Sequence, residues 1–269
     1  MRYESPPKEL FIENRKRFSD QMVQNSVAVF NSNDILPTSA DGTMPFIQQS
    51  DMYYLSGIDQ EESILVLFPD SSDTVLKEAL FIKETSQEIA IWEGEKLSQD
   101  QAKEISGIQS VYWLSQFESI FSSMVFQAKT IYLNSNEHLR ASRIVQTRDD
   151  RFANLCKEKY PHHKYERSQP ILHDLRPVKS EAEIAQLQRA IDITELAFRR
   201  VLGFIEPGTY EFEIEAEMIH EFVRNGSRRF AFQPIIASGY NACVLHYIEN
   251  KDMCRDGTEN FWVYTGFTY

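Results

Sequence analysis

The sequence has few cysteines and no long hydrophobic run, and both shortages exclude classes of protein. Its three cysteines, Cys156, Cys243 and Cys254, are odd in number and form no C-x-x-C pair. A disulfide framework and a thiolate zinc site are therefore not expected, and the chain suits a reducing cytoplasm. No segment approaches the roughly 20 consecutive apolar residues of a membrane-spanning helix, so no membrane partner is expected.

Basic charge is also scarce. The chain has 28 lysines and arginines against 40 aspartates and glutamates, and its formal net charge of −12 would repel phosphate backbones. The densest basic cluster, residues 224–230, is short and typical of a solvated turn that closes a helix. Nucleic acid is therefore not expected as a partner. The N-terminal stretch "MRYESPPKELFIENRKRF" lacks the apolar core of a secretory signal, which predicts a cytoplasmic protein.

Several catalytic signatures are missing as well. The sequence contains no H-E-x-x-H, no G-x-S-x-G and no phosphate-binding glycine loop, so zincin, serine hydrolase and P-loop functions are unsupported. Glu217 and His220 form one E-x-x-H step, but a di-iron bundle needs a second step and further glutamates, which favours a solvated acidic helix face. The adjacent His162 and His163 lie in a basic stretch with a proline, and a surface loop is favoured there over a metal site.

The first part of the chain alternates strand-like and helix-like segments. Short β-branched or aromatic runs of strand length occupy residues 26–30, 63–68, 79–82, 111–114 and 130–133. Helix-like stretches occupy residues 7–24, 98–106 and 149–159. This alternation predicts an α/β domain.

A change of pattern around Pro170 and Pro177 predicts a domain boundary, with one domain at residues 1–172 and a second at 173–269. Ser180 and Glu183 form a capping box that predicts the start of a helix, and Pro207 follows its end. One face of this helix is apolar and is made of Ile184, Leu187, Ile191, Phe198, Val201 and Leu202.

A second helix is expected over residues 210–226, followed by two apolar runs at 230–239 and 242–248 that predict paired strands. His246 lies near the end of the second run. A single histidine there is often a hydrogen-bonded structural residue. However, Asn241 and Asn250 flank it, and the glycine-containing turn before it would let the strands open onto a pocket. Residue patterns alone leave both interpretations open.

Longer stretches resemble a known family. The segments "LRPVKSEAEIAQLQRAIDITELAFRRVL", "PGTYEFEIEAEM", "PIIASGYNACVLHYIEN" and "RDG" resemble the start of the catalytic domain of Xaa-Pro aminopeptidases (aminopeptidase P). The segment "ADGTMPFIQQSDMYYLSGIDQEESILVLFPD" resembles their N-terminal creatinase-like domain. The resemblance implies an α/β N-terminal domain with a mixed sheet, followed by an incomplete α+β pita-bread domain.

The resemblance also implies a chemistry. In this family two metal ions, usually manganese, hold a hydroxide that attacks the peptide bond before proline, and two aspartates, one histidine and two glutamates bind the metals. A further histidine, in an H-Y-x-E-N motif, contacts the substrate and stabilises the tetrahedral intermediate. That histidine matches His246, and the resemblance places Tyr240 and Asn241 beside the substrate.

The sequence departs from the family after "RDG". Where the first metal-binding aspartate is expected, either Tyr264 or Val263 stands, depending on the alignment, and the other ligands would follow Tyr269. This chain is therefore expected to hold no metal.

The leading hypothesis is a fragment or truncated product of a cytoplasmic, homo-oligomeric, manganese-dependent Xaa-Pro aminopeptidase, acting on peptides with proline at position two. A catalytically inactive pita-bread module that binds peptides or proteins is the first alternative, and a prolidase acting on dipeptides is the second.

Overall fold

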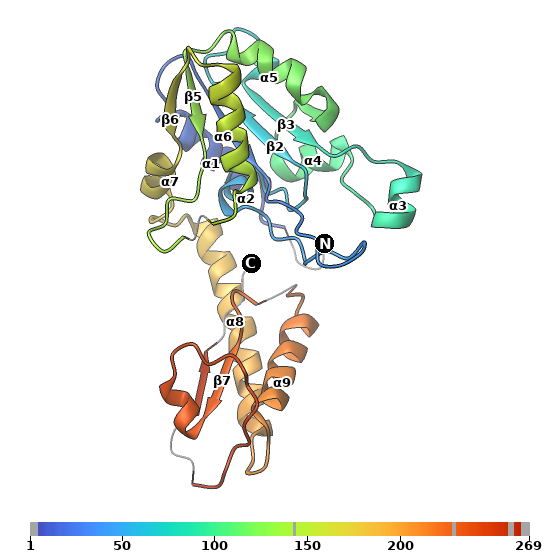
Figure 1. Cartoon of the computed structure of the whole chain (residues 1–269), viewed down its shortest axis with the longest axis vertical. Coiled ribbons are helices and arrows are strands. Elements are labelled where there is room, and N and C mark those ends of the chain that lie inside the picture. Colours follow the sequence, from blue (N-terminus) through green and yellow to red (C-terminus); the bar gives the residue numbers. More distant parts are fainter. Residues whose placement is uncertain (1–4, 142–143, 228–229, 258–260, 265–269) are drawn as a thin grey trace. The chain divides into compact units, whose positions relative to one another are not determined.

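The computed structural model describes residues 5–141, 144–227, 230–257 and 261–264, and for 261–264 only the course of the backbone. Its contacts divide the chain into two compact units. The N-terminal unit is Pro6–Val178, and the C-terminal unit is Lys179–Tyr269 together with Met1–Ser5 (Figure 1). The predicted domain boundary at 172/173 lies within helix α7 (Gln169–Leu175), six residues before the end of the N-terminal unit.

A six-stranded mixed sheet forms the centre of the N-terminal unit, in the order β4-β3-β2-β1-β5-β6. Its strands are β1 (Ser26–Asn31), β2 (Ile64–Leu67), β3 (Glu78–Ile82), β4 (Val111–Trp113), β5 (Thr130–Leu133) and β6 (Lys164–Arg167). Strand β2 runs antiparallel to β1 and β3, whereas the β3/β4, β1/β5 and β5/β6 pairs are parallel. In this register Val29 lies opposite Val66 on one side and Leu133 on the other. The mixed α/β sheet predicted from the sequence is confirmed.

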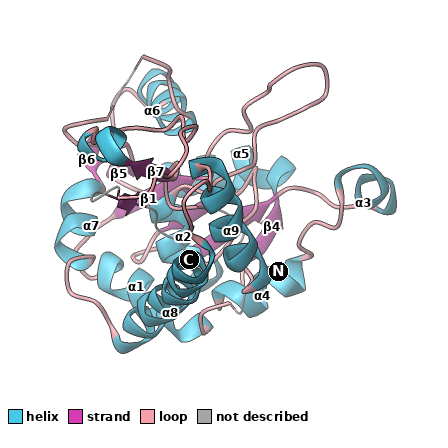
Figure 2. Ribbon diagram, turned by 90° about the horizontal axis from the view of Figure 1, so that it is seen from below, coloured by secondary structure: helices cyan, strands magenta, loops and turns pink. Residues whose placement is uncertain are grey.

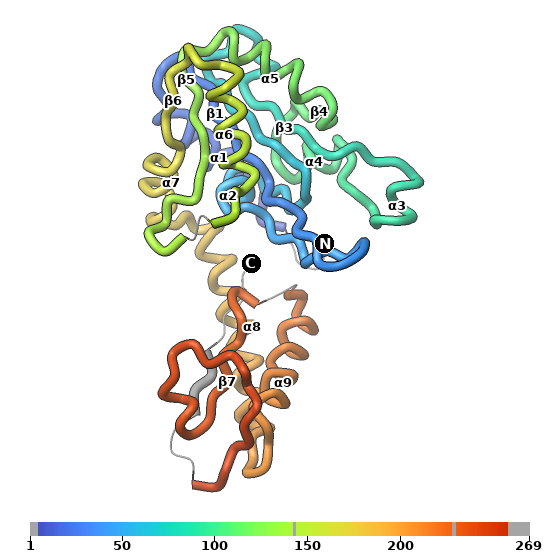
Figure 3. The backbone as a smooth tube through the Cα atoms, viewed as in Figure 1, coloured from blue at the N-terminus to red at the C-terminus, as the bar shows by residue number. Residues whose placement is uncertain are grey.

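Helices cover both faces of this sheet, and its central strands β1 and β2 are buried along their whole length (Figure 2). The helices are α1 (Lys8–Ser19), α2 (Ser50–Ser56), α3 (Gln87–Glu93), α4 (Gln99–Ser106), α5 (Phe117–Val125), α6 (Arg148–Lys159) and α7, with short 3₁₀ turns η1 (Thr74–Leu76) and η2 (Leu114–Gln116). Side chains of α1, α2, α4 and α7 form a buried cluster with one face. Side chains of α5 and α6 form the other cluster. Figure 3 shows the segment that carries α3 extending away from the sheet.

The C-terminal unit is built from two long helices and a short strand pair. Helix α8 (Glu181–Phe204) begins at the predicted capping box, in which the Glu183 amide donates to Ser180 Oγ at 3.3 Å and the Ser180 amide donates to Glu183 Oε2 at 2.8 Å. Helix α9 (Glu211–Arg224) packs beside it. Strand β7 (Ile235–Ser238) pairs antiparallel with β8 (Phe261–Tyr264). In the part of the chain that is described, no helix is both long and apolar enough to span a bilayer.

One predicted strand is wrong. Residues 242–248 were expected to pair with the run before them, but the chain forms a 3₁₀ turn, η3 (Gly239–Cys243), and then a further turn. Gly239 has a φ of 54°, and the Val244 amide donates to the Asn241 carbonyl at 2.9 Å. The backbone therefore leaves the extended conformation directly after β7, and the partner strand comes from later in the chain.

The apolar face predicted for α8 is only partly buried. Val201 is buried with Ile193 and Ala197 against α9 and β7. The other residues of that face are between 46% and 63% exposed: Ile184, Leu187, Ile191, Phe198 and Leu202. These five residues, called the α8 stripe below, face away from the cluster because α9 contacts the neighbouring side of the helix.

Candidate functional site

His246 lies on the turn that follows η3, in the C-terminal unit, and its side chain is exposed. The side chains around it differ in exposure. Tyr240 is 85% exposed, whereas Asn250 is 3% exposed, and Asn241 and Tyr247 are half-buried. The turn therefore presents His246 and Tyr240 to solvent while the neighbouring polar side chains point into the unit.

One buried carboxylate accepts hydrogen bonds from most of these inward-pointing side chains. Glu211, the first residue of α9, is 0% exposed. Its Oε1 accepts from the amide and hydroxyl of Ser238 at 2.7 and 3.0 Å, and from Asn241 Nδ2 at 3.4 Å. Its Oε2 accepts from the Tyr247 hydroxyl at 2.7 Å and from the Asp252 amide at 2.9 Å. Such a full set of donors lets a carboxylate be buried without a cationic partner.

Asn250 is the second anchor of the turn. Its Oδ1 accepts from the Ile236 amide at 3.0 Å, and its Nδ2 donates to Glu215 Oε2 at 2.8 Å and to the Pro234 carbonyl at 3.1 Å. The backbone of Asn250 has a φ of 45°, a left-handed conformation that asparagine tolerates better than most residues. Asn250 thereby ties the end of the turn to both β7 and α9.

Burial also changes the acidity of groups near the turn. Desolvation raises the pKa of the Tyr247 phenol, the hydrogen bond from the Lys251 amide lowers it, and the hydrogen bond to Glu211 raises it again. The phenol is therefore held as a donor toward Glu211 at neutral pH. Desolvation likewise raises the pKa of the Cys254 thiol, which keeps this buried cysteine in its neutral form.

The described residues do not fit a dinuclear metal centre. Among them, no three His, Cys, Asp or Glu side chains are grouped so that they would hold a metal ion. Val263 and Tyr264, the two positions aligned with the family's first aspartate, pair through β8 with Ile236 and Ile235. A valine side chain has no donor atom, and a tyrosine does not supply a carboxylate.

One member of each of the other two pairs singled out in the sequence has a structural partner. Glu217 forms an ion pair with Arg200 of α8, and His220 is exposed on α9. His163 Nε2 lies 2.9 Å from the Val125 carbonyl, and its ring packs edge-on against Tyr160. Neither pair is assembled with further ligands among the described residues.

A buried polar network in the N-terminal unit was not predicted from the sequence. It lies after the carboxyl ends of the parallel strands β1, β5 and β6, and links Asn31, Asp51, Asn134, Asp149 and Gln169. Asn31 Nδ2 donates to Asp149 Oδ1 at 2.8 Å, and Gln169 Nε2 donates to Asp51 Oδ2 at 2.8 Å. Asn134 Nδ2 lies between the two carboxylates, at 3.2 Å from Asp51 and 3.4 Å from Asp149. The pKa of Asp149 is raised to about 7, chiefly by burial and also by the Asp51 charge, against the hydrogen bonds from Asn31 and Asn134 that lower it.

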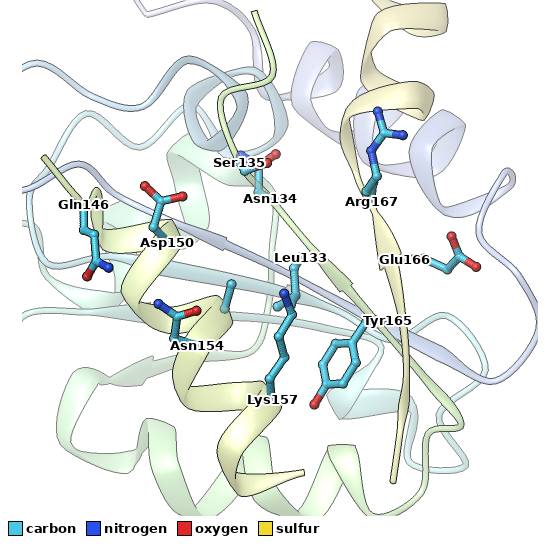
Figure 4. Close-up of a pocket in the computed structure, with 11 residues that line it drawn as sticks. Leu133, Asn134, Ser135, Gln146, Asp150, Asn154, Lys157, Tyr165, Glu166 and Arg167 are labelled. Atoms are coloured by element: carbon cyan, nitrogen blue, oxygen red, sulfur yellow. The ribbon is translucent and has the colours of Figure 1, made fainter. Parts of the chain in front are cut away.

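A pocket of about 510 Å³ borders this network. Figure 4 shows Asp150, Asn154 and Lys157 projecting from α6, with Tyr165 on β6 and Asn134 after β5. In open α/β sheets, ligands bind beyond the carboxyl ends of the strands. Here the buried side chains at that edge hydrogen-bond one another, which stabilises the edge itself.

Two known protein families match this chain, one in each of its two parts. The family description "Aminopeptidase P, N-terminal domain" matches residues 11–132, and "Metallopeptidase family M24" matches residues 185–269. The Xaa-Pro aminopeptidase of Escherichia coli (strain K12) is 32% identical over 249 residues, which cover 92% of this chain and 56% of that protein. That of Haemophilus influenzae is 28% identical over 251 residues, with coverage of 93% and 56%.

Solved structures give the same result. Aminopeptidase P from Escherichia coli in its low-pH form superimposes with a TM-score of 0.84 at 30% identity, over 97% of this chain and 59% of that one. Aminopeptidase PepP of Pseudomonas aeruginosa gives a TM-score of 0.86 at 25% identity, over 98% and 59%. The chain belongs to the aminopeptidase P family of M24 metallopeptidases, and combines its N-terminal domain with part of the metallopeptidase domain. It spans little more than half the length of these relatives.

Proposed function

We propose that this chain is the N-terminal portion of an Xaa-Pro aminopeptidase, which releases the N-terminal residue that precedes proline in a peptide. Residues 1–172 would form its N-terminal domain and residues 173–269 the first half of its catalytic domain. The similarity to relatives named Xaa-Pro aminopeptidases over more than nine-tenths of this chain supports the proposal. We further expect a cytoplasmic homo-oligomer.

The observation that carries the proposal is that the turn around His246 is held in place by hydrogen bonds from its neighbouring residues. The histidine is exposed, while Tyr247 and Asn250 of the same H-Y-x-E-N motif are held by Glu211 and Glu215. An imidazole N–H on an anchored turn suits a donor aimed at charge that develops on a carbonyl oxygen. Tyr240 and Asn241, on the same turn, would contact the peptide.

The metal ions of the family, which we expect to be manganese, would need ligands that the described residues do not provide. We therefore propose that this chain is inactive by itself, and that the coding sequence after the Tyr269 codon supplies the missing ligands. A second candidate function, a binding module without catalysis, is favoured by that same lack of grouped ligands.

The first test is to sequence the source DNA past the Tyr269 codon and translate it in all three frames. A continuation with two aspartates, a histidine and two glutamates in family order supports the peptidase. An in-frame stop with no such coding sequence would instead favour the binding module.

The second test uses the longer protein that this continued coding sequence would encode, called the continued enzyme below. It is purified with Mn²⁺ and assayed on tripeptides with proline or alanine at position two. We expect cleavage of the proline peptide, and a loss of about 10²–10³-fold in kcat for His246→Ala, as for removal of one oxyanion donor. His162→Ala, in the N-terminal unit, is the matched control and should keep full activity. Equal cleavage of both peptides, or an unimpaired His246→Ala variant, would contradict the proposal.

A further inference from the structure

Helix α9 carries two carboxylates, Glu211 and Glu215, that lie one helical turn apart and face the segment after β7. Residues four apart lie on the same side of a helix, so one face of α9 serves both. Glu211 accepts from residues 238, 241, 247 and 252, and Glu215 accepts from Asn250. Glu211 therefore contacts the chain on both sides of His246.

The main chain of Glu211 joins the same segment. Its amide donates to the Asp252 carbonyl at 2.9 Å, while its carboxylate accepts from the Asp252 amide at the same distance. Tyr210 and Met253 form an isolated antiparallel bridge beside this pair. The start of α9 and the end of the turn are therefore fastened through both backbone and side chain.

The contact nearest to His246 is made by the next residue. The Tyr247 hydroxyl donates to Glu211 Oε2 at 2.7 Å and accepts from the Lys251 amide at 3.2 Å. A phenol with partners on two sides has one rotational position, and its backbone is held with it. Because His246 precedes Tyr247 directly, this hydrogen bond restrains the backbone from which the imidazole projects.

We propose that Glu211 is a positioning residue, whose buried carboxylate holds the turn of residues 239–252 so that His246 is presented in one place. The importance of His246 for catalysis rests on the proposed function, whereas the ordering of the turn by Glu211 does not. The hydrogen bond from Tyr247 links Glu211 to the backbone next to His246, and the hydrogen bond between Asn250 and Glu215 holds the C-terminal end of the turn.

A carboxylate is needed because donors approach both of its oxygens. In Glu211→Gln one oxygen becomes an NH₂ group, which would face either the Ser238 amide or the Asp252 amide, and both are donors. The substitution keeps the size of the side chain, so it tests hydrogen bonding rather than packing. Tyr247→Phe removes one hydroxyl and leaves Glu211 in place.

The test is NMR of the isotopically labelled full chain for the wild type, Glu211→Gln, Tyr247→Phe and the control Glu213→Gln. Glu213 lies on the same helix, and its exposed carboxylate accepts from the Tyr210 amide at the helix start. In the wild type we expect backbone order parameters of about 0.85 for residues 244–248. In Glu211→Gln and Tyr247→Phe they should fall below about 0.6. Hydrogen exchange of the Ser238 and Asp252 amides should become at least about tenfold faster in Glu211→Gln, equivalent to about 1.4 kcal/mol of opening free energy.

The exchange of the buried Val201 amide reports whether the unit is still folded. Unchanged order at residues 244–248 in folded Glu211→Gln and Tyr247→Phe would overturn the proposal. If Glu211→Gln unfolds the unit, Tyr247→Phe decides alone. A mobile turn in these variants, combined with full activity of His246→Ala in the continued enzyme, would refute the role of His246 but leave Glu211 as the positioning residue.

Discussion

Asp149 is a buried carboxyl whose ionisation affects the stability of the N-terminal unit. The residue is 8% exposed, and desolvation is the main reason that the pKa of its carboxyl rises from 3.8 to about 7. Between these two values the folded state binds a proton that the unfolded state has lost. The stability of the folded unit therefore falls as the pH rises from about 4 to about 7, by about 1.4 kcal/mol per pH unit.

This effect predicts how Asp149→Asn behaves. Asparagine carries no charge at any pH, so the loss of stability that the wild type suffers between pH 5 and pH 8 should shrink by about 3 kcal/mol in the variant. Urea unfolding at pH 5 and pH 8 measures the free energy of unfolding of both proteins. The adjacent Asp150→Asn, which alters the capping interaction with Thr147, is the control and should keep the wild-type dependence. An equal pH dependence in wild type and Asp149→Asn would contradict the burial argument.

The candidate site could be predicted only in part from the residues themselves. Residue patterns alone leave His246 open between a structural and a functional role, the resemblance to the family's H-Y-x-E-N motif points to function, and that role remains a prediction. Glu211 gives no comparable signal, because a glutamate in the first turn of a helix is common for its favourable interaction with the helix dipole. Its function as a hydrogen-bond acceptor depends on contacts between residues 27 to 41 positions apart, which no local pattern contains.

At the scale of the elements, two helices end in the same way but against different neighbours. Gly57 ends α2 and Gly107 ends α4, with left-handed φ values of 70° and 75°. A Cβ added at Gly57 would lie 2.4 Å from the ring of Phe11, which is 2% exposed. A Cβ at Gly107 would lie 2.6 Å from the side chain of Ile12, which is 39% exposed and free to move.

Alanine at these two positions separates backbone strain from steric overlap. Both variants incur about 1 kcal/mol for the left-handed conformation. Gly57→Ala should incur about 1–3 kcal/mol more, because the buried ring cannot move without disturbing the core. Urea unfolding of the N-terminal unit measures the difference, and equal losses in the two variants would contradict it.

The strands that the sequence predicted in the N-terminal sheet share strong apolar patterns, whereas the missed edge strand β6 does not. Strands β1 to β5 were predicted because apolar or aromatic residues dominate them. Strand β6 has the sequence KYER and lies at the edge of the sheet, where charged side chains protect against pairing with other chains. Residues 242–248 mislead in the opposite way, because their apolar side chains lie on a turn; Val244 and Leu245 are 41% and 69% exposed.

At the scale of the whole molecule, the two units differ in how much apolar surface they bury. The N-terminal unit has a buried cluster on each face of its sheet. Among its described side chains, the C-terminal unit has one small cluster, and the α8 stripe leaves five large apolar side chains at least 46% exposed. Exposed apolar surface of this kind contributes nothing to the stability of the unit and favours association. The C-terminal unit is therefore expected to be the less stable one.

We expect urea to unfold the full chain in two transitions, with the C-terminal unit first, because each unit has its own core. Hydrogen exchange of peptides from β1 and β2, compared with peptides from α8 and α9, distinguishes the units at each urea concentration. Val201→Ala should lower only the first transition, by about 1–3 kcal/mol, since Val201 belongs to the small cluster. Leu202→Ala, one residue further and 63% exposed, should leave both transitions unchanged. A single cooperative transition, or a shift of both transitions in Val201→Ala, would show that the units are stabilised together.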